Sequence, residues 1–494
     1  MHSPILMIEN FFNIDKSLEH SKIIRFGLVY FSIFILFIVT ILFLPNTKIH
    51  FILPRILSII ALLVLSFPVL KKLKLDVFEP IVFFVASFFF GGVLRTCYLV
   101  SSSQASMLPY GVELFSLTLA LVWSILGFIC LQWGYNNRLA SKIASTIPTY
   151  NDKTWNKRRL WLVVTAFSLV GLIAYSVFLE STGGIPTNLT EFSMKRNIRN
   201  GYIRWGVELL YIAFLLAFGN HLKQNLSLRS FRGIILVLLA ILALSFPFLT
   251  SSRGSMLTLL LLTLFIYHYY KRRVEIRKLV ILITIFAMIV VIMGGLRRAS
   301  YQGLVGFYKY NKGGMFPAFQ RIFVEGHYLF DITTFARLVQ DVPEQLSFQW
   351  GSTLINWVFW PIPRNLWAEK PINLGQRIGA QIYNQGVGVV GGGVPPPFIA
   401  ELYLNFHLAG IIVGMFFFGL FSRSLYLHML ENRDRITTLL IYAVTLRSLW
   451  GLFQSDLTQT MVGYLQWMVP LVVSIHFITH GRIVRTVSFE KKKS

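Results

Sequence analysis

The chain has 494 residues, of which 55% are hydrophobic and only 14% are charged, and its formal net charge is +25. Its Phe-, Leu- and Ile-rich runs are long enough to cross the roughly 30 Å hydrocarbon layer of a bilayer, which excludes a soluble globular protein. The basic residues form short clusters between these runs, so membrane topology explains the charge better than a nucleic-acid partner does. Cys97 and Cys130 both lie in apolar runs, which supports neither a disulfide framework nor a cysteine metal site.

Twelve apolar segments predict an all-α polytopic membrane protein, with residues 1–494 forming a single membrane domain. The first segment is predicted to be a retained helix, because no small-residue cleavage site follows it. In chain order, the predicted membrane helices are 26–44, 56–70, 78–100, 112–134, 160–179, 205–220, 233–249, 254–270, 279–296, 398–421, 436–454 and 461–479.

Clusters of lysine and arginine set the expected orientation of these helices. They fall in every second connection, as at Lys71–Lys74, Lys157–Arg159 and Lys271–Arg273, and they recur in the tail at Lys491–Lys493. Cytoplasmic loops carry an excess of basic residues, so both termini are predicted to be cytoplasmic.

Two connections on the opposite, external side are basic against this trend. They are 180–204 and the long loop 297–397, which joins the ninth and tenth predicted helices. A loop of that length usually has a function. Within it, Leu354–Trp360 predicts a re-entrant or interfacial helix, and the glycine-rich Tyr383–Phe398 predicts a mobile flap.

Arg253 is a single charge in a stretch that is otherwise apolar or small from Gly233 to Tyr270. A charge at membrane depth is costly, and such residues are usually functional. The predicted helix 254–270 is only about 25 Å long at 1.5 Å per residue, so the turn before it must dip towards the membrane. Arg204 opens another span, and the positions of Arg95 and Arg447 within theirs place them at or below the same external boundary.

Such a cluster suits a multiply anionic lipid headgroup, because a guanidinium binds phosphate oxygens in pairs and keeps its charge. We predict a lipid pyrophosphate. No Asp-x-Asp pair and no histidine cluster with metal-ligand spacing occurs, so neither a metal nor a cofactor is expected. The predicted phosphate-binding residues are Arg253, Arg199, Arg204, Arg364, Arg377, Arg447 and Arg95.

Several of these arginines also have a structural interpretation. Arg253 and Arg95 can snorkel to the headgroups, and Arg447 can pair with Asp456 or Glu208.

A sugar on the headgroup would make the site a transferase, which needs a base for the attacking hydroxyl. Glu401, near the outer end of the tenth predicted helix, is the first candidate, followed by His327 and Glu369. Trp350, Trp357, Trp360 and Trp367 can stack on sugar faces or form an ordinary interfacial belt.

Three stretches resemble the Wzy-type polymerases of lipid-linked oligosaccharide repeat units, the O-antigen polymerase group. They are "SSRGSMLTLLLL" from Ser251, "PRNLWAEKP" from Pro363 and "FIAELYLNFHLAG" from Phe398, with "DVFEPIVFFVASFFFGGVLR" as weaker support. The layout is similar too, although O-antigen ligases share it and both groups are GT-C-like glycosyltransferases. The resemblance assigns Arg253, Arg364 and Glu401 to matching positions. Where it expects Gly after Asn-Phe, this chain has His407.

The resemblance implies metal-independent transfer of a growing glycan from undecaprenyl pyrophosphate to the next lipid-linked unit, at the periplasmic face of the bacterial inner membrane. Expected partners are the undecaprenyl-pyrophosphate-linked oligosaccharides, the bilayer, and a chain-length regulator and flippase of the same pathway. Arg253 would also act in catalysis beside Glu401 and His327. Two alternatives are a ligase that transfers glycan to lipid A core and a polysaccharide-lipid flippase or transporter. The lopsided loop argues against the transporter.

Overall fold

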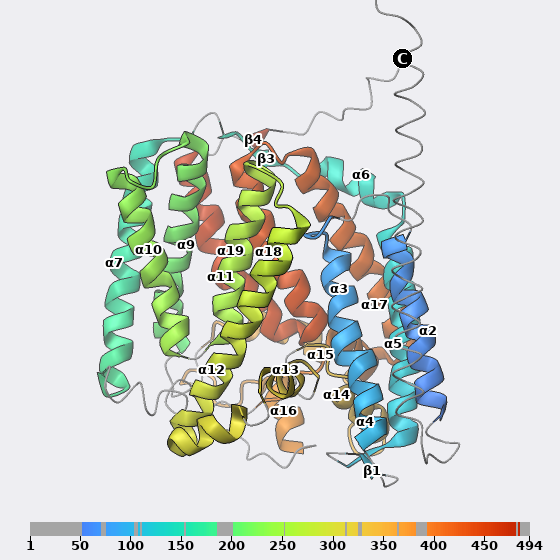
Figure 1. Ribbon diagram of the computed structural model, residues 1–494. Helices are drawn as coiled ribbons and strands as arrows, with labels where there is room; N and C mark the ends of the chain where they lie inside the picture. The colour runs from blue at the N-terminus through green and yellow to red at the C-terminus, as the bar shows by residue number, and fades with distance from the viewer. Residues whose placement is uncertain are drawn as a thin grey trace, which may run out of the picture. The chain divides into compact units, whose positions relative to one another are not determined.

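The computed structural model describes most of the chain, and its described part is predominantly helical (Figure 1). Its strands are two-residue pieces in two antiparallel pairs. The described residues are 52–70, 76–102, 107–108, 111–152, 155–184, 201–250, 252–311, 314–324, 329–362, 365–381, 393–480 and 483–484.

Eight helices of the described part are long and apolar enough to cross a membrane, and they coincide with eight of the predicted spans. This finding confirms the prediction of an all-α, multi-pass membrane protein. The eight segments are Pro80–Ser101, Leu114–Tyr135, Lys157–Ser181, Tyr202–Gln224, Phe231–Leu249, Phe398–Glu431, Ile436–Gln454 and Leu457–Ile478.

The other four predicted spans are not among these eight helices. Two correspond to shorter apolar helices, Ile52–Ser66 and Gly254–Tyr270. The predicted span 279–296 lies within the longer helix α12 (Ile276–Asn311), which therefore continues into the predicted external loop. The first predicted span, 26–44, lies outside the described residues.

The chain divides into two compact units, each assembled from separate stretches of sequence. Unit 1 comprises residues 1–135, 327–350 and 396–419, and unit 2 comprises 136–326, 351–395 and 420–494. The predicted external loop thus contributes residues 327–350 and 396–397 to unit 1, and residues 297–326 and 351–395 to unit 2.

Unit 1 is built around α5, which packs against α2 and α14. Gly91 and Gly92 lie in a π-helical turn between α3 and α4, where a Cβ on Gly91 would come within 2.0 Å of the carbonyl oxygen of Phe330. The helix therefore approaches the backbone before α14 so closely that only glycine fits. The elements are α2 (Ile52–Leu70), α3 (Pro80–Phe88), η2 (Phe89–Leu94), α4 (Arg95–Ser102), β1 (Met107–Leu108), β2 (Val112–Glu113), α5 (Leu114–Tyr135), α14 (Ile332–Asp341) and the first part of α17 (Phe398–Glu431).

Helix α17 breaks within unit 1, at Phe406 and His407. Phe406 has φ −138° and ψ 21°, and His407 has φ 53° and ψ −141°. The backbone N–H of Gln349 donates to the carbonyl of Leu404 at 3.0 Å, which satisfies a group near the break. A positive φ is a conformation that glycine adopts without a Cβ penalty, and this explains why the resemblance expects glycine at position 407.

Unit 2 is a helical bundle in which α9 packs against α7 and α10, and α18 packs against α11 and α19 (Figure 1). Its strands β3 (Thr149–Tyr150) and β4 (Ile483–Val484) pair near the start of α18. The helices are α6 (Leu139–Thr146), α7 (Lys157–Ser181), α9 (Gly201–Gln224), α10 (Phe231–Leu249), α11 (Arg253–Tyr270), α12, α13 (Met315–Phe323), α15 (Ser352–Ile355), η5 (Asn356–Phe359), α16 (Leu374–Gln381), the second part of α17, α18 (Ile436–Gln454) and α19 (Leu457–Ile478).

The two ends of unit 2 are formed by different helix termini and turns. At the β3 end, α7 begins with the basic residues Lys157–Arg159, and Asp152 caps α18 by accepting a hydrogen bond from the backbone N–H of Ile436 at 2.6 Å. The other end, here called the α15 end, carries the start of α9, the α10–α11 turn and the α18–α19 turn (Figure 1). Thr458 fixes α15 there, since its hydroxyl donates to the carbonyl of Thr353 at 3.1 Å.

The break in α17 yields a stability prediction. We expect His407→Gly to raise the free energy of unfolding by about 1–3 kcal/mol, because a left-handed backbone strains any residue with a Cβ. His407→Ala keeps that strain and loses the ring contacts to Tyr403 and Phe348, whose centroids lie at 5.0 and 5.9 Å. Thermal unfolding in detergent measures both variants. A glycine variant less stable than the alanine variant would contradict the prediction.

Candidate functional site

Two of the predicted arginines meet around one carboxylate in unit 2. Arg204, in the first turn of α9, places Nε 3.7 Å from Oε1 of Glu208 one turn later. Trp467 of α19 donates its Nε1–H to Oε2 of the same carboxylate at 2.9 Å. The guanidinium of Arg447, on α18, lies 4.4 Å from the centre of the Trp467 ring. We call these four residues the Glu208 cluster.

The charges of the Glu208 cluster do not cancel. Glu208 is the acidic group with the strongest electrostatic effect on Arg447, whose Nη1 donates to the carbonyl of Gly463 at 3.5 Å. Of the two structural partners that the sequence allows for Arg447, Glu208 is therefore the one that acts on it. The three ionised side chains of the cluster together carry one net positive charge.

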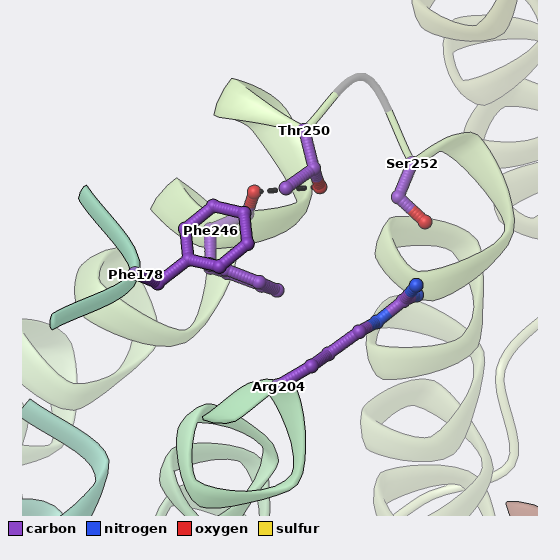
Figure 2. Close-up of a pocket in the computed structure, with 5 residues that line it drawn as sticks. All are labelled: Phe178, Arg204, Phe246, Thr250 and Ser252. Carbon is purple, nitrogen blue, oxygen red and sulfur yellow. Dashed lines mark hydrogen bonds between the residues drawn. The ribbon is translucent and has the colours of Figure 1, made fainter. Parts of the chain in front are cut away.

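Arg204 also lines a small pocket, whose other walls come from α7, α10 and the turn between α10 and α11 (Figure 2). The Arg204 side chain reaches from α9 towards Ser252, the residue before α11 (Figure 2). Phe178 and Phe246, with ring centroids 5.2 Å apart, form the apolar wall, and Thr250 completes the lining. The cavity measures about 70 Å³, well below the 300–1,000 Å³ typical of sites that enclose a whole ligand. It suits a single small group.

The turn between α10 and α11 shapes this pocket. The hydroxyl of Thr250 donates to the carbonyl of Phe246 at 2.8 Å, and the N–H of Ser252 donates to the carbonyl of Pro247 at 2.8 Å. These bonds close the end of α10 and start α11 at Arg253. The N-terminus of a helix carries a partial positive charge and free N–H groups. Ser252, the residue before α11, lines the pocket together with Arg204, so the start of α11 lies next to this space.

The side chains of four predicted site residues lie outside the described part. Arg253 is the first residue of α11, as the prediction of a turn before it requires, but only its backbone is described. Arg199, Arg364 and His327 fall outside the described residues altogether. Arg377 is described and half-buried in α16, next to a backbone hydrogen bond from Val394 to Gly375.

Arg95 and Glu401 belong to unit 1, and both side chains are buried. Arg95 is 2% exposed, and its Nη1 lies 3.8 Å from Oδ1 of Asp331. Asp331 caps α14 by accepting hydrogen bonds from Thr333 and Thr334. Arg95 therefore ties α4 to the start of α14. Glu401 is fully buried in the first turn of α17.

Among the other residues of the site, Glu208 was named from the sequence only as a possible partner of Arg447. Glu208 follows Arg204 by four residues, a spacing that places two side chains on one helix face, and this signal was available. Trp467, Phe178 and Thr250 carry no such signal, because their contacts arise from packing between helices. In the described part of the chain, no three His, Cys, Asp or Glu side chains converge on a common point.

Comparison with known proteins gives a limited result. A family model described as a domain of unknown function (DUF8712) matches residues 206–451. The matched region begins just after Arg204 and includes Glu208, Arg253 and Arg447. No curated protein and no solved structure matches the chain.

Asp456 is a buried carboxylate at the same end of unit 2. It caps α19 by accepting a hydrogen bond from the N–H of Gln459 at 2.8 Å, and its residue is 0% exposed. Burial raises the pKa of Asp456 from 3.8 to about 6, against the smaller opposing effect of its backbone hydrogen bonds. The folded protein thus binds a proton that the unfolded chain releases at lower pH.

This raised pKa predicts a pH-dependent stability. Between about pH 4 and pH 6 the folded state holds more protons at Asp456 than the unfolded state, so stability falls as the pH rises through that window. Asp456→Asn keeps a capping side chain but removes the titration. We expect the melting temperature of the wild type to fall relative to that of the variant from pH 4 to pH 6. Parallel melting profiles would show that Asp456 does not titrate in this window.

The Glu208 cluster predicts a charge-dependent stability. Glu208→Gln retains an acceptor for Trp467 but leaves Arg204 and Arg447 without their carboxylate, so we expect a loss of about 2–3 kcal/mol. Adding Arg447→Met should recover part of this loss, because it removes one of the two charges left unpaired. Thermal unfolding in detergent measures both. Glu180→Gln, which changes an exposed residue at the same end, is the matched control. Equal stability of Glu208→Gln and the wild type would contradict the shared-carboxylate interpretation.

Proposed function

We propose that the protein polymerises undecaprenyl-pyrophosphate-linked oligosaccharide repeat units, as a metal-independent, GT-C-like membrane glycosyltransferase. In this reaction, a hydroxyl of the terminal sugar of one lipid-linked unit attacks the anomeric carbon of the growing glycan. The bond from that carbon to the pyrophosphate oxygen breaks, a glycosidic bond forms, and undecaprenyl pyrophosphate leaves. The proton of the attacking hydroxyl passes to a base. The resemblance at Ser251–Leu262, Pro363–Pro371 and Phe398–Gly410 supports this class of reaction.

The observation that carries the proposal is the placement of Arg204. Its side chain is 42% exposed, lines a pocket sized for one small group, and faces the start of α11. The departing pyrophosphate develops negative charge in the transition state, and fixed cations and helix N-termini stabilise such charge. A guanidinium remains charged at any physiological pH, so the site would need no metal ion to neutralise the leaving group.

The other predicted residues extend this role. Arg253, Arg199, Arg364 and Arg377 would bind further phosphate oxygens, and Arg447 would act through Glu208, which it shares with Arg204. The proton acceptors predicted from the sequence are Glu401 and His327; Glu401 belongs to unit 1, so its role stays a prediction separate from the pocket of unit 2.

The proposed topology has twelve membrane helices, a periplasmic loop over residues 297–397 between the ninth and tenth, and both termini in the cytoplasm. The β3 end of unit 2, with Lys157–Arg159, would face the cytoplasm, and the α15 end would face the periplasm of the inner membrane. The basic start of α7 supports this orientation under the positive-inside rule. A chain-length regulator and a flippase of the pathway would act beside the polymerase.

Reconstitution tests the proposal directly. Purified protein in liposomes should convert undecaprenyl-pyrophosphate-linked repeat units into longer chains, with the same product sizes in the presence of a chelator. We expect Arg204→Ala and Arg253→Ala each to lower the rate at least about a hundredfold, because each removes charge from the leaving group. Lysine at either position should also be deficient, since it cannot bind two phosphate oxygens in one plane.

Arg158→Ala is the matched control, because Arg158 is an exposed arginine at the opposite end of unit 2. Full activity in the Arg204→Lys and Arg253→Lys variants would contradict the phosphate-binding role. The same assay separates the alternatives. Chain growth without lipid A core excludes a ligase, and translocation of repeat units without chain growth would identify a flippase.

A further inference from the structure

Three aromatic side chains lie beside Arg204: two come from α9 itself, and the third comes from the segment after η5. Trp205 of α9 and Trp360, directly after η5, stack with ring centroids 4.6 Å apart and an interplanar angle of 26°. Tyr202, one turn before Trp205, meets its ring edge-on at 5.7 Å and lies 6.3 Å from Trp360. We call Tyr202, Trp205 and Trp360 the aromatic platform.

Contacts of the segment that carries Trp360 hold the platform in place. The segment that carries Trp360 is anchored because α15 and η5 pack on α19. Lys370 donates from Nζ to the carbonyl of Trp360 at 2.7 Å and to that of Ile362 at 2.9 Å. The same ammonium group lies 5.7 Å from the centre of the Trp360 ring. The platform is thus fixed, and a positive charge lies over the Trp360 ring.

The platform and the pocket lie on neighbouring sides of the same helical turn. Arg204 and Trp205 are consecutive in α9, and successive side chains of an α-helix diverge by about 100°. Arg204 faces the start of α11, and Trp205 faces Trp360. Tyr202 is 56% exposed, and the two tryptophans are partly exposed, so the rings are open to a ligand.

We propose that the aromatic platform binds the first pyranose of a lipid-linked glycosyl pyrophosphate, while Arg204 binds the adjoining phosphate. This inference rests on the proposed function and names the sugar-binding part of the same site. A pyranose offers an apolar C–H face that an aromatic ring can cover, and Arg204 and Lys370 provide positive charge around the rings for the attached diphosphate. Amphipathic rings at a membrane surface can also anchor a protein to headgroups. Anchoring requires neither the stacked pair nor the pocket beside it.

Binding measurements with three matched lipids distinguish sugar binding from headgroup anchoring. The probes are undecaprenyl pyrophosphate and the same lipid carrying one glucose or one N-acetylglucosamine, each titrated against the full protein in nanodiscs. We expect Trp360→Ala and Trp205→Ala to weaken binding of both glycosylated lipids about three- to tenfold and to leave the sugar-free lipid unchanged. Arg204→Ala should weaken all three lipids. Unchanged binding of the sugar-free lipid also shows that the tryptophan variants remain folded.

Trp133→Ala is the matched control, since Trp133 is an exposed tryptophan of unit 1 that packs on another ring, Phe416. Trp360→Phe, which retains a ring, should bind the glycosylated lipids better than Trp360→Ala. Equal weakening of all three lipids in the alanine variants would identify a headgroup anchor and overturn the proposal. Unaltered binding in both variants would overturn it too.

The outcomes also separate this inference from the proposed function. Sugar-dependent weakening in a protein that forms no longer chains would refute the polymerase and retain the platform. Chain growth with tryptophan variants that bind normally would refute the platform alone.

Discussion

The proposed site depends on the ion pair and the hydrogen bond that the Glu208 carboxylate makes. Arg204 of α9 pairs with this carboxylate, Trp467 of α19 donates a hydrogen bond to it, and Arg447 of α18 lies over the Trp467 ring. Charges within a membrane bundle are costly unless they are paired, and a paired charge that also accepts a hydrogen bond is tolerated. One carboxylate for two guanidinium groups stabilises the junction of three helices and leaves a positive charge. A second carboxylate would satisfy the fold better and weaken the attraction for an anion.

The α10–α11 turn adds the positive partial charge of a helix N-terminus, which comes from the backbone and not from a side chain. Hydrogen bonds from Thr250 and Ser252 close α10 and bring the start of α11 opposite Arg204. The backbone dipoles of α11 then act in the same direction as the guanidinium. Arg253, the residue that stands out in the sequence, begins this helix. The turn that shapes the pocket occupies length that a full span would need, which accounts for the shortness of this span.

The sequence predicts those parts of this arrangement that depend on residues close together along the chain. Apolar runs of membrane length identified the helices, and the spacing of Arg204 and Glu208 is that of one helix turn. Trp205 and Trp360 meet only because the loop segment with η5 packs on α19, and no periodicity encodes that contact. Arg95 was predicted to bind phosphate, or alternatively to snorkel to the headgroups, and its position beside Asp331 depends on a segment that was assigned to the external loop. The break in α17 was not predicted, although the resemblance expected glycine where His407 now adopts a positive φ.

In the proposed site, arginine side chains would bind the pyrophosphate and aromatic rings would bind the sugar. Pyrophosphate is common to the donor and the acceptor of a repeat-unit polymerase, so arginines that bind it cannot tell one lipid-linked glycan from another. The pocket of about 70 Å³ is sized for one small group. In the proposed function, residues next to the pocket would recognise the sugar, and the platform of Tyr202, Trp205 and Trp360 begins on the adjoining face of the same turn. Stacking tolerates many pyranoses, so exclusion of the wrong glycan requires polar groups beyond these rings.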